Sequence, residues 1–204
     1  MTPGARVQSA IGLLGEILPS DGPTADAAVR GWFRARRYAG SKDRAAVTGL
    51  VYQILRQRGE LKFSLADASG VASLVADASG VQAAPSSSAS RDLVIAALVR
   101  IEGLSADDVA ARFDGSQYGP TVLTDDEQAM IAHLGTADTP DSAPDWVRGN
   151  YRQGLDASLR AGLGDNVVAE MAAMIPRAST DLRVNTLKSD RGAAQASLDA
   201  DGIQ

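Results

Sequence analysis

The sequence predicts a mainly α-helical protein, and three observations support this fold class. Apolar residues recur at spacings of three and four through most of the first 175 residues, which is the period of a helix with one buried face. Proline and glycine interrupt this pattern at short intervals and so separate individual helices. The alternation of residue character that is typical of a strand first occurs late in the chain, at 181–188.

Three helices are expected before residue 60. The first covers 5–18 and ends at Pro19, and the second begins near Pro23 and Thr24. A break at Gly40 follows, after which Ser41 is a natural N-cap for the third helix. The expected buried faces consist of Val7, Ile11, Leu14 and Leu18 in the first helix, Val29, Trp32 and Phe33 in the second, and Val47, Leu50, Val51, Ile54 and Leu55 in the third.

Residues 64–90 interrupt the helical pattern. They contain LADASGV, then VADASGV ten residues later, then AAPSSSAS, and this composition predicts a loose insertion. Helical periodicity resumes at Ser90. SADD at 105 and TDDE at 124 have the form of capping boxes that open short helices. We interpret their acidic residues as helix caps in preference to catalytic carboxylates, because anions are favoured at helix N-termini.

The segment TADTPDSAPDW at 136–146 is the expected boundary between two parts of the chain. It is rich in Pro, Asp, Ser and Thr and has no apolar periodicity. We therefore expect an all-helical domain at 1–135, a linker at 136–145 and a second region at 146–204.

The second region is expected to begin with helices and then to change its period. One helix should start at Trp146 and another should cover 165–175. The stretch DLRVNTLK at 181–188 is a predicted strand, and a helix should follow at 189–201. Because one strand and one helix cannot bury a sheet face, we expect these residues to be the truncated start of an α/β subdomain.

Positive charge is concentrated in one part of an acidic chain. The net charge is −5, yet residues 30–62 contain nine Lys and Arg against two acidic residues. This local excess of seven positive charges leaves the remainder with an excess of twelve negative charges. The stretch WFRARRYAGSKDR at 32–44 also places aromatic residues among the cations. Such a patch suits docking onto a polyanion, although a solvated Arg-rich helix face has the same composition.

The sequence excludes several classes of site. It contains no cysteine, which excludes disulfides, thiolate metal sites and thiol nucleophiles. His133 is the single histidine, so we interpret it as structural and expect no metal site. No apolar run approaches the ~20 residues of a bilayer span, and the first 20 residues do not have the pattern of a signal peptide. We expect a cytoplasmic, monomeric protein that binds no membrane.

Several of these stretches together resemble a known family. RRYAGSKDRAAVTGLVYQILR, the Pro- and Asp-rich hinge, PDWVRGN, and DLRVNTLKSDRGAAQASLDADGI are similar to the N-terminal part of the Sun/RsmB/NOP family of S-adenosylmethionine-dependent RNA cytosine-5 methyltransferases. The resemblance covers nearly the whole chain except 64–90. It implies a NusB-like helical bundle at 1–135, then a helical linker and the truncated start of an α/β subdomain. The implied partner is ribosomal RNA, specifically 16S RNA of the small subunit.

The resemblance and the basic stretch together give the candidate RNA-binding residues. Trp32 and Phe33 are expected to face the core while the cations lie outside. Guanidinium contacts to phosphate supply affinity without base specificity. The RVNT stretch resembles the strand that opens the family's α/β subdomain. The candidates are Arg34, Arg36, Arg37, Tyr38, Lys42, Arg44, Arg183 and Asn185.

The resemblance also implies chemistry that this chain cannot supply. Methylation of cytosine at carbon-5 requires a thiolate that adds to carbon-6, and the family uses two cysteines, whereas this chain has none. The Gly-rich strand–turn–helix that holds the adenosyl group is also missing. We therefore expect the chain to be the RNA-binding part of an enzyme whose full-length form uses S-adenosylmethionine, with no catalytic or cofactor-binding residue of its own.

Two alternatives belong to other functional classes. The first is a stand-alone NusB-like factor for antitermination or ribosome assembly, which the strand at 181–188 argues against. The second is a helical scaffold whose basic patch binds an acidic protein. Salt-dependent RNA binding separates the scaffold from the other two readings. The gene sequence beyond Gln204 separates the methyltransferase from both alternatives.

Overall fold

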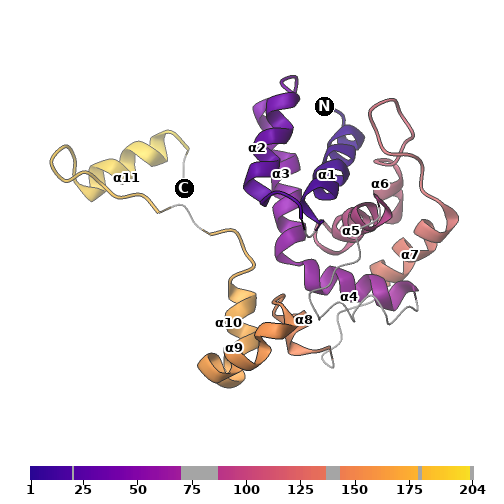
Figure 1. Cartoon of the computed structure of the whole chain (residues 1–204). Helices are drawn as coiled ribbons and strands as arrows, with labels where there is room; N and C mark the ends of the chain where they lie inside the picture. The colour runs from indigo at the N-terminus through magenta and orange to yellow at the C-terminus, as the bar shows by residue number, and fades with distance from the viewer. Residues whose placement is uncertain (20, 70–86, 137–142, 179–180, 203–204) are drawn as a thin grey trace.

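The computed structural model describes residues 1–19, 21–69, 87–136, 143–178 and 181–202. These residues are mainly helical, which confirms the mainly α fold class. The first part of the chain contains α1 (Pro3–Ile17), α2 (Ala25–Ala35), α3 (Ser41–Arg56), α4 (Arg58–Ser69), α5 (Ser87–Arg100), α6 (Ala106–Ala110) and α7 (Asp125–Thr136), shown in Figure 1. The second part contains α8 (Asp145–Arg148), α9 (Asp156–Leu163), α10 (Val167–Ala173) and α11 (Arg191–Ala200), with 3-10 helices at Gln153–Leu155 and Gly164–Asn166.

The hydrophobic core is built around α5. All seven residues from Leu93 to Val99 are buried, so this helix is apolar on every side, as expected for a helix inside a bundle. It packs against α1, α3, α4, α6 and α7. Helix α1 also packs against α2 and α3. Figure 1 shows α2 and α3 at one side of the bundle, and they carry the basic stretch.

The predicted inward orientation of the aromatic pair in α2 is confirmed. Trp32 is 8% exposed and Phe33 is 6% exposed. Gly12 of α1 makes room for the indole ring, since a Cβ built on Gly12 would lie 2.5 Å from Cη2 of Trp32. This distance is far below the optimal carbon–carbon separation of about 3.5–4.0 Å. The contact between Gly12 and Trp32 therefore fixes how closely α2 approaches α1.

The predicted caps at Ser105 and Thr124 are confirmed, the second as a full capping box, whereas the predicted cap of α3 is wrong. Ser105 accepts a hydrogen bond from the backbone N–H of Asp108. Thr124 and Glu127 form a reciprocal box, in which each side chain accepts from the backbone N–H of the other residue. Ser41 is the first residue of α3 and not its N-cap, because Gly40 occupies the cap position and no side chain caps this helix.

The segment 64–90 was expected to be a loose insertion, and its ends are in fact helical. Residues 64–69 complete α4, and residues 87–90 begin α5. Leu65 and Ala66 are buried, so the apolar face of α4 continues into the segment despite its Ala- and Ser-rich composition. Residues 70–86, which hold the near-repeat, lie outside the described residues.

The first helix after the predicted linker docks on the bundle. Residues 137–142 of that linker lie outside the described part, but α8 packs against α4. The backbone N–H of Glu60 donates to Oδ1 of Asn150 at 2.9 Å. Close by, the hydroxyl of Tyr151 donates to Asp156 at 2.6 Å. Burial, followed by this hydrogen bond, raises the pKa of Tyr151 to about 12.

The predicted strand at 181–188 is not formed in the structure. Residues 181–185 have no regular secondary structure, and a turn follows at 186–188. The side chain of Asn185 accepts from the N–H of Leu187 at 3.1 Å, and its carbonyl accepts from the N–H of Lys188 at 2.9 Å. A strand needs a hydrogen-bonding partner, and no described residue supplies one. The helix expected at 189–201 is confirmed as α11, which Gly202 follows at φ +70°.

The ion pair between Arg91 and Glu127 gives a testable pH dependence. Glu127 accepts from Nε of Arg91 at 2.5 Å and from Nη2 at 3.0 Å. The hydrogen bond from Arg91 is the main cause that lowers the pKa of Glu127, and burial opposes it. A lowered folded-state pKa means that the stabilisation is present above the unfolded pKa of about 4.3 and is lost as the pH falls through the folded value.

We expect Glu127→Gln to lower the free energy of unfolding at pH 7 by about 1.5–3 kcal/mol, the range for a hydrogen bond to a charged group. Urea unfolding of both proteins between pH 7 and pH 3 checks this. The difference in the free energy of unfolding between the wild type and the variant should shrink below about pH 4. An equal difference at every pH would show that the Arg91 ion pair is not its cause.

Candidate nucleic-acid interface

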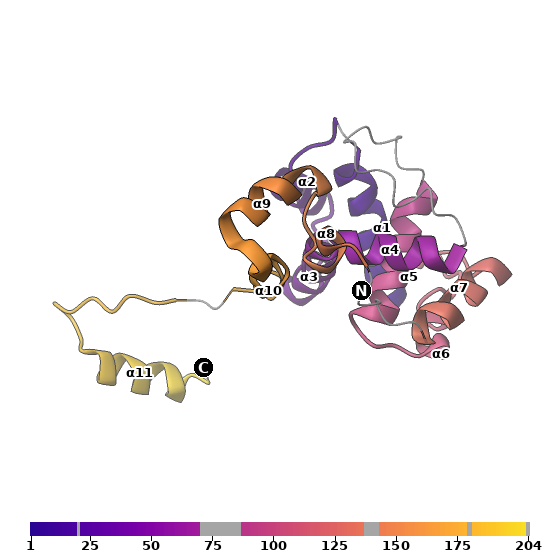
Figure 2. The same cartoon turned by 90° about the horizontal axis from the view of Figure 1, so that it is seen from below.

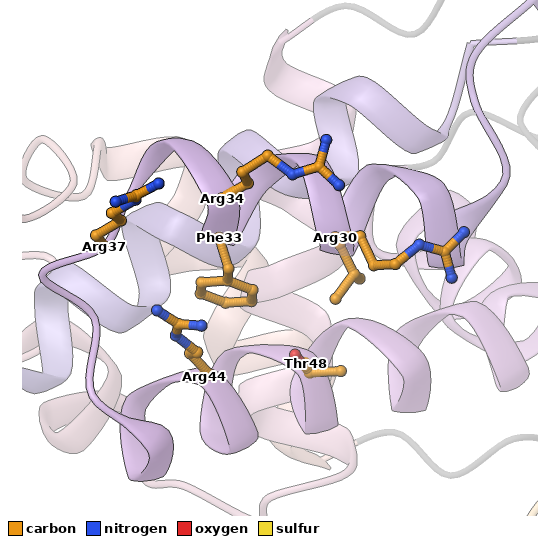
Figure 3. A pocket seen from close by; sticks show the side chains of 7 residues that line it. Arg30, Phe33, Arg34, Arg37, Arg44 and Thr48 are labelled. Carbon is orange, nitrogen blue, oxygen red and sulfur yellow. The ribbon is translucent and has the colours of Figure 1, made fainter.

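A groove between α2 and α3 collects three of the six predicted cations, Arg34, Arg37 and Arg44. Its volume is about 690 Å³, and it is lined by Val29, Arg30, Phe33, Arg34, Arg37, Arg44 and Thr48; we call it the basic groove. Four of these seven residues are arginines and none is acidic. Figure 3 shows Arg30, Arg34 and Arg37 extending from the α2 side, Arg44 and Thr48 from α3, and the Phe33 ring between them. The groove is therefore a concave cationic surface with an aromatic floor.

The spacing of the arginines explains why they share one side of α2. Arg30 and Arg34 are four residues apart in α2, which places them on one helical face, and Arg37 follows three residues later. Arg37 lies in the turn that follows the helix. Phe33 is buried on this same side, where it lines the groove, and its packing against the core fixes the orientation of α2. The hydrophobic packing of α2 thus orients the cations.

Three of the predicted cations are available for a ligand. In the part of the chain that the structure describes, the side chains of Arg34, Arg37 and Lys42 form no hydrogen bond, ion pair or aromatic contact. Arg34 and Arg37 line the groove, whereas Lys42 does not. Arg44 is held in place, because its Nε donates to the carbonyl of Ala39 at 2.9 Å and its guanidinium carbon lies 5.7 Å from the Phe33 ring centre. The groove combines one fixed guanidinium group with exposed ones that can reach phosphates.

The acidic residue within the basic stretch does not neutralise the groove. Asp43 accepts hydrogen bonds from the N-terminal ammonium of Met1 at 3.1 Å and from Nε of Arg6 at 2.8 Å. The hydrogen bond from the ammonium group, followed by that from Arg6, lowers the pKa of Asp43. Its negative charge is balanced by cations from α1 and the chain start, so the arginines of the groove keep their net positive potential.

Two predicted residues lie on a different surface. Arg36 stacks on Trp32 with its guanidinium carbon 3.4 Å from the ring centre, and its Nη1 donates to the carbonyl of Trp32 at 3.4 Å. Tyr38 is 73% exposed. Both residues line a second cavity beside α1 and do not line the basic groove. The predicted residues of 32–44 are therefore divided between two surfaces of the structure.

Arg183 and Asn185 are not brought to the basic groove. Both are exposed in the segment that precedes α11, and Figures 1 and 2 show this segment apart from α2 and α3. Its large side chains are also uncovered, since Leu182 is 63% exposed and Leu187 is 94% exposed. The structure thus gives no shared site for the two groups of candidates.

Sequence reasoning missed four lining residues of the basic groove, namely Val29, Arg30, Phe33 and Thr48. Arg30 had a usable signal, because RGWFRARR places Arg at the first, fifth and eighth positions. This is the repeat of a single helical face. Phe33 was assigned to the core, which is correct for most of its surface. Thr48 had no signal, since its role depends on how α3 lies beside α2.

The described residues contain no cluster of metal-ligating side chains and no strand–turn–helix. Among them, no three His, Asp or Glu side chains come together in a way that could hold a metal ion. The adenosyl group of S-adenosylmethionine is held in doubly wound folds by a strand–turn–helix, and the described part of the chain has no strand. It also has no helix that is long and apolar enough to cross a bilayer.

No protein-family model matches the chain, and neither the curated proteins nor the solved structures contain a significant match. The functional argument therefore depends on the geometry and charge of the basic groove.

Proposed function

We propose that this chain binds RNA and that the basic groove holds the RNA backbone. The observation that carries the proposal is the gathering of Arg30, Arg34, Arg37 and Arg44 around one groove with no acidic lining residue, in a chain of net charge −5. Guanidinium groups match phosphate oxygens in geometry and charge. The acidic remainder of the chain repels RNA elsewhere, so the charge distribution also orients the complex.

Folded RNA is the class of substrate that this groove suits best. Groups that contact phosphates recognise the path of the backbone and not the base sequence. The candidate ligand is ribosomal RNA of the small subunit, on the basis of the family resemblance. On the same basis, the chain would position RNA for a cytosine-5 methyltransferase core that uses S-adenosylmethionine, in the cytoplasm.

One observation strengthens the rival function of a stand-alone RNA-binding factor. The predicted strand at 181–188 was the argument against it, and that strand is not formed. Both functions require RNA binding at the basic groove, so the groove does not separate them. The gene sequence beyond Gln204 does: a Gly-rich strand–turn–helix with cysteines would support the methyltransferase, and a stop codon would support the stand-alone factor.

The test of RNA binding is its dependence on salt. A fragment of small-subunit ribosomal RNA should bind with an affinity that falls linearly on a log–log scale as salt is raised, by about 0.7–0.9 per phosphate contact. An acidic peptide of matched charge is the control, because a scaffold for acidic proteins would bind it equally well. Equal affinity for the peptide, or no RNA binding at low salt, would contradict the proposal.

We expect the isolated chain to transfer no methyl group to RNA. The reaction needs a thiolate nucleophile, and the chain has no cysteine. Incubation with labelled S-adenosylmethionine and ribosomal RNA should give the counts of a protein-free control. Cytosine-5 methylation above that background would overturn the assignment of this chain to RNA binding without catalysis.

A further inference from the structure

A second and larger cavity lies on the other side of α2. Its volume is about 1180 Å³, and it is lined by residues of α1, the first turn of α5, Arg36, Tyr38 and the loop 117–121; we call it the polar groove. The start of α1 approaches this loop closely, since a Cβ on Gly4 would lie 3.6 Å from Cα of Gly119. The volume exceeds the 300–1,000 Å³ of typical small-molecule sites, so it suits a segment of polymer.

Two exposed aromatic side chains line the polar groove. Tyr38 is 73% exposed and Tyr118 is 72% exposed, and neither hydroxyl has a hydrogen-bond partner among the described residues. They come from sequence positions 80 residues apart, yet both line this cavity. Exposed tyrosines of this kind supply flat faces on which unpaired bases stack.

The charge of the polar groove differs from that of the basic groove. No acidic residue lines it within the described structure. Arg91 lines it too, but its charge is matched by the ion pair with Glu127. Arg36 is the remaining cation among the lining side chains, and it lies flat on the Trp32 ring. Gln8 and Gln117 add amide groups that can bond base edges. This chemistry suits bases better than a row of phosphates.

The two grooves lie on either side of the end of α2. Arg37 lines the basic groove, and its sequence neighbours Arg36 and Tyr38 line the polar groove. An RNA strand that passes over the end of α2 can therefore place phosphates in the first groove and bases in the second.

We infer that the polar groove binds unpaired RNA nucleotides adjoining the folded RNA whose backbone occupies the basic groove. Tyr38 and Tyr118 are the stacking surfaces, and Arg36 closes the groove above Trp32. The inference rests on the proposed RNA binding and adds to it the class of nucleotide that is recognised. A single-stranded segment next to a stem is the ligand that fills both grooves.

Three RNA probes test the inference by fluorescence anisotropy. The first is a blunt stem–loop, the second carries a short unpaired tail, and the third carries the same tail without bases and therefore with the same charge. The wild-type protein should bind the second probe more tightly than the third. The expected difference is about 5- to 150-fold for each base that stacks.

Substitution of the two tyrosines then locates the effect. Tyr38→Ala with Tyr118→Ala should remove the advantage of the tail with bases over the tail without bases. Tyr38→Phe with Tyr118→Phe should retain it, because a phenyl ring still stacks. The salt dependence should be unchanged in both variants, since neither residue is charged.

The outcomes separate this inference from the proposed function. Salt-dependent binding of the blunt stem–loop, together with equal affinity for the two tailed probes, overturns the inference and leaves the basic groove intact. An advantage of the bases that survives the double alanine substitution also overturns it. Failure of all three probes to bind overturns the proposed function itself.

Discussion

Replacement of Arg34 and Arg37 together by alanine is expected to weaken RNA binding and to lower its salt dependence. Both residues line the basic groove and have no structural partner in the described part of the chain. Each phosphate contact contributes about 0.7–0.9 to the log–log slope of affinity against salt. The double variant should therefore have a slope smaller by about 1.4–1.8, measured by anisotropy on the stem–loop from 50 to 200 mM salt.

A matched control changes the same charge elsewhere. Arg152→Ala with Arg177→Ala removes two exposed arginines whose side chains also form no hydrogen bond or ion pair within the described residues. Arg160 would be a poor control, because it forms ion pairs with Asp145 and Asp156. The control pair should leave the slope close to that of the wild type. An equal decrease of the salt slope in both double variants would mean that net charge, and not the basic groove, governs binding.

Trp32→Ala is expected to be the most destabilising single substitution in α2. The indole ring is buried against Gly12 and is covered by Arg36, and a large-to-small change at such a site typically costs about 3–5 kcal/mol. For a chain of this length that corresponds to a decrease in Tm of about 6–20 °C. Thermal unfolding followed by circular dichroism measures it.

Tyr38→Ala is the control for that experiment, because it removes an aromatic ring that is 73% exposed. Its effect on stability should stay within about 0.5 kcal/mol, as for other surface substitutions. A similar decrease in Tm for both variants would contradict the assignment of Trp32 to the core. It would also remove the reason why α2 presents its arginines outward.

The sequence predicted the helices of the bundle where local signals and burial agree. The period of α1 to α3, the caps at Ser105 and Thr124, and the stop at Gly202 are local features, and the structure has them. The strand predicted at 181–188 is not formed, because its stability would depend on distant residues and not on local features. A strand is stabilised by residues that are distant in the sequence, and alternation of side chains alone cannot provide that partner.

The sequence predicted which residues carry the positive charge, but not that they are divided between two grooves. The sequence placed Arg34, Arg36 and Arg37 together, whereas successive helical residues are about 100° apart and Arg36 falls on the side of Trp32. Helical spacing alone could have separated them. The pairing of Tyr38 with Tyr118 could not be predicted, because it depends on the loop before α7 reaching the start of α1.

The most direct test of the basic groove is a map of the RNA contact surface. Backbone amide signals of the labelled chain can be followed by NMR as a small-subunit ribosomal RNA fragment is added at low salt. The largest shifts are expected for residues 30–44 and for Thr48, with small changes on α9 and α10. Shifts concentrated at 145–202, with 30–44 unchanged, would contradict the account that the groove between α2 and α3 binds RNA.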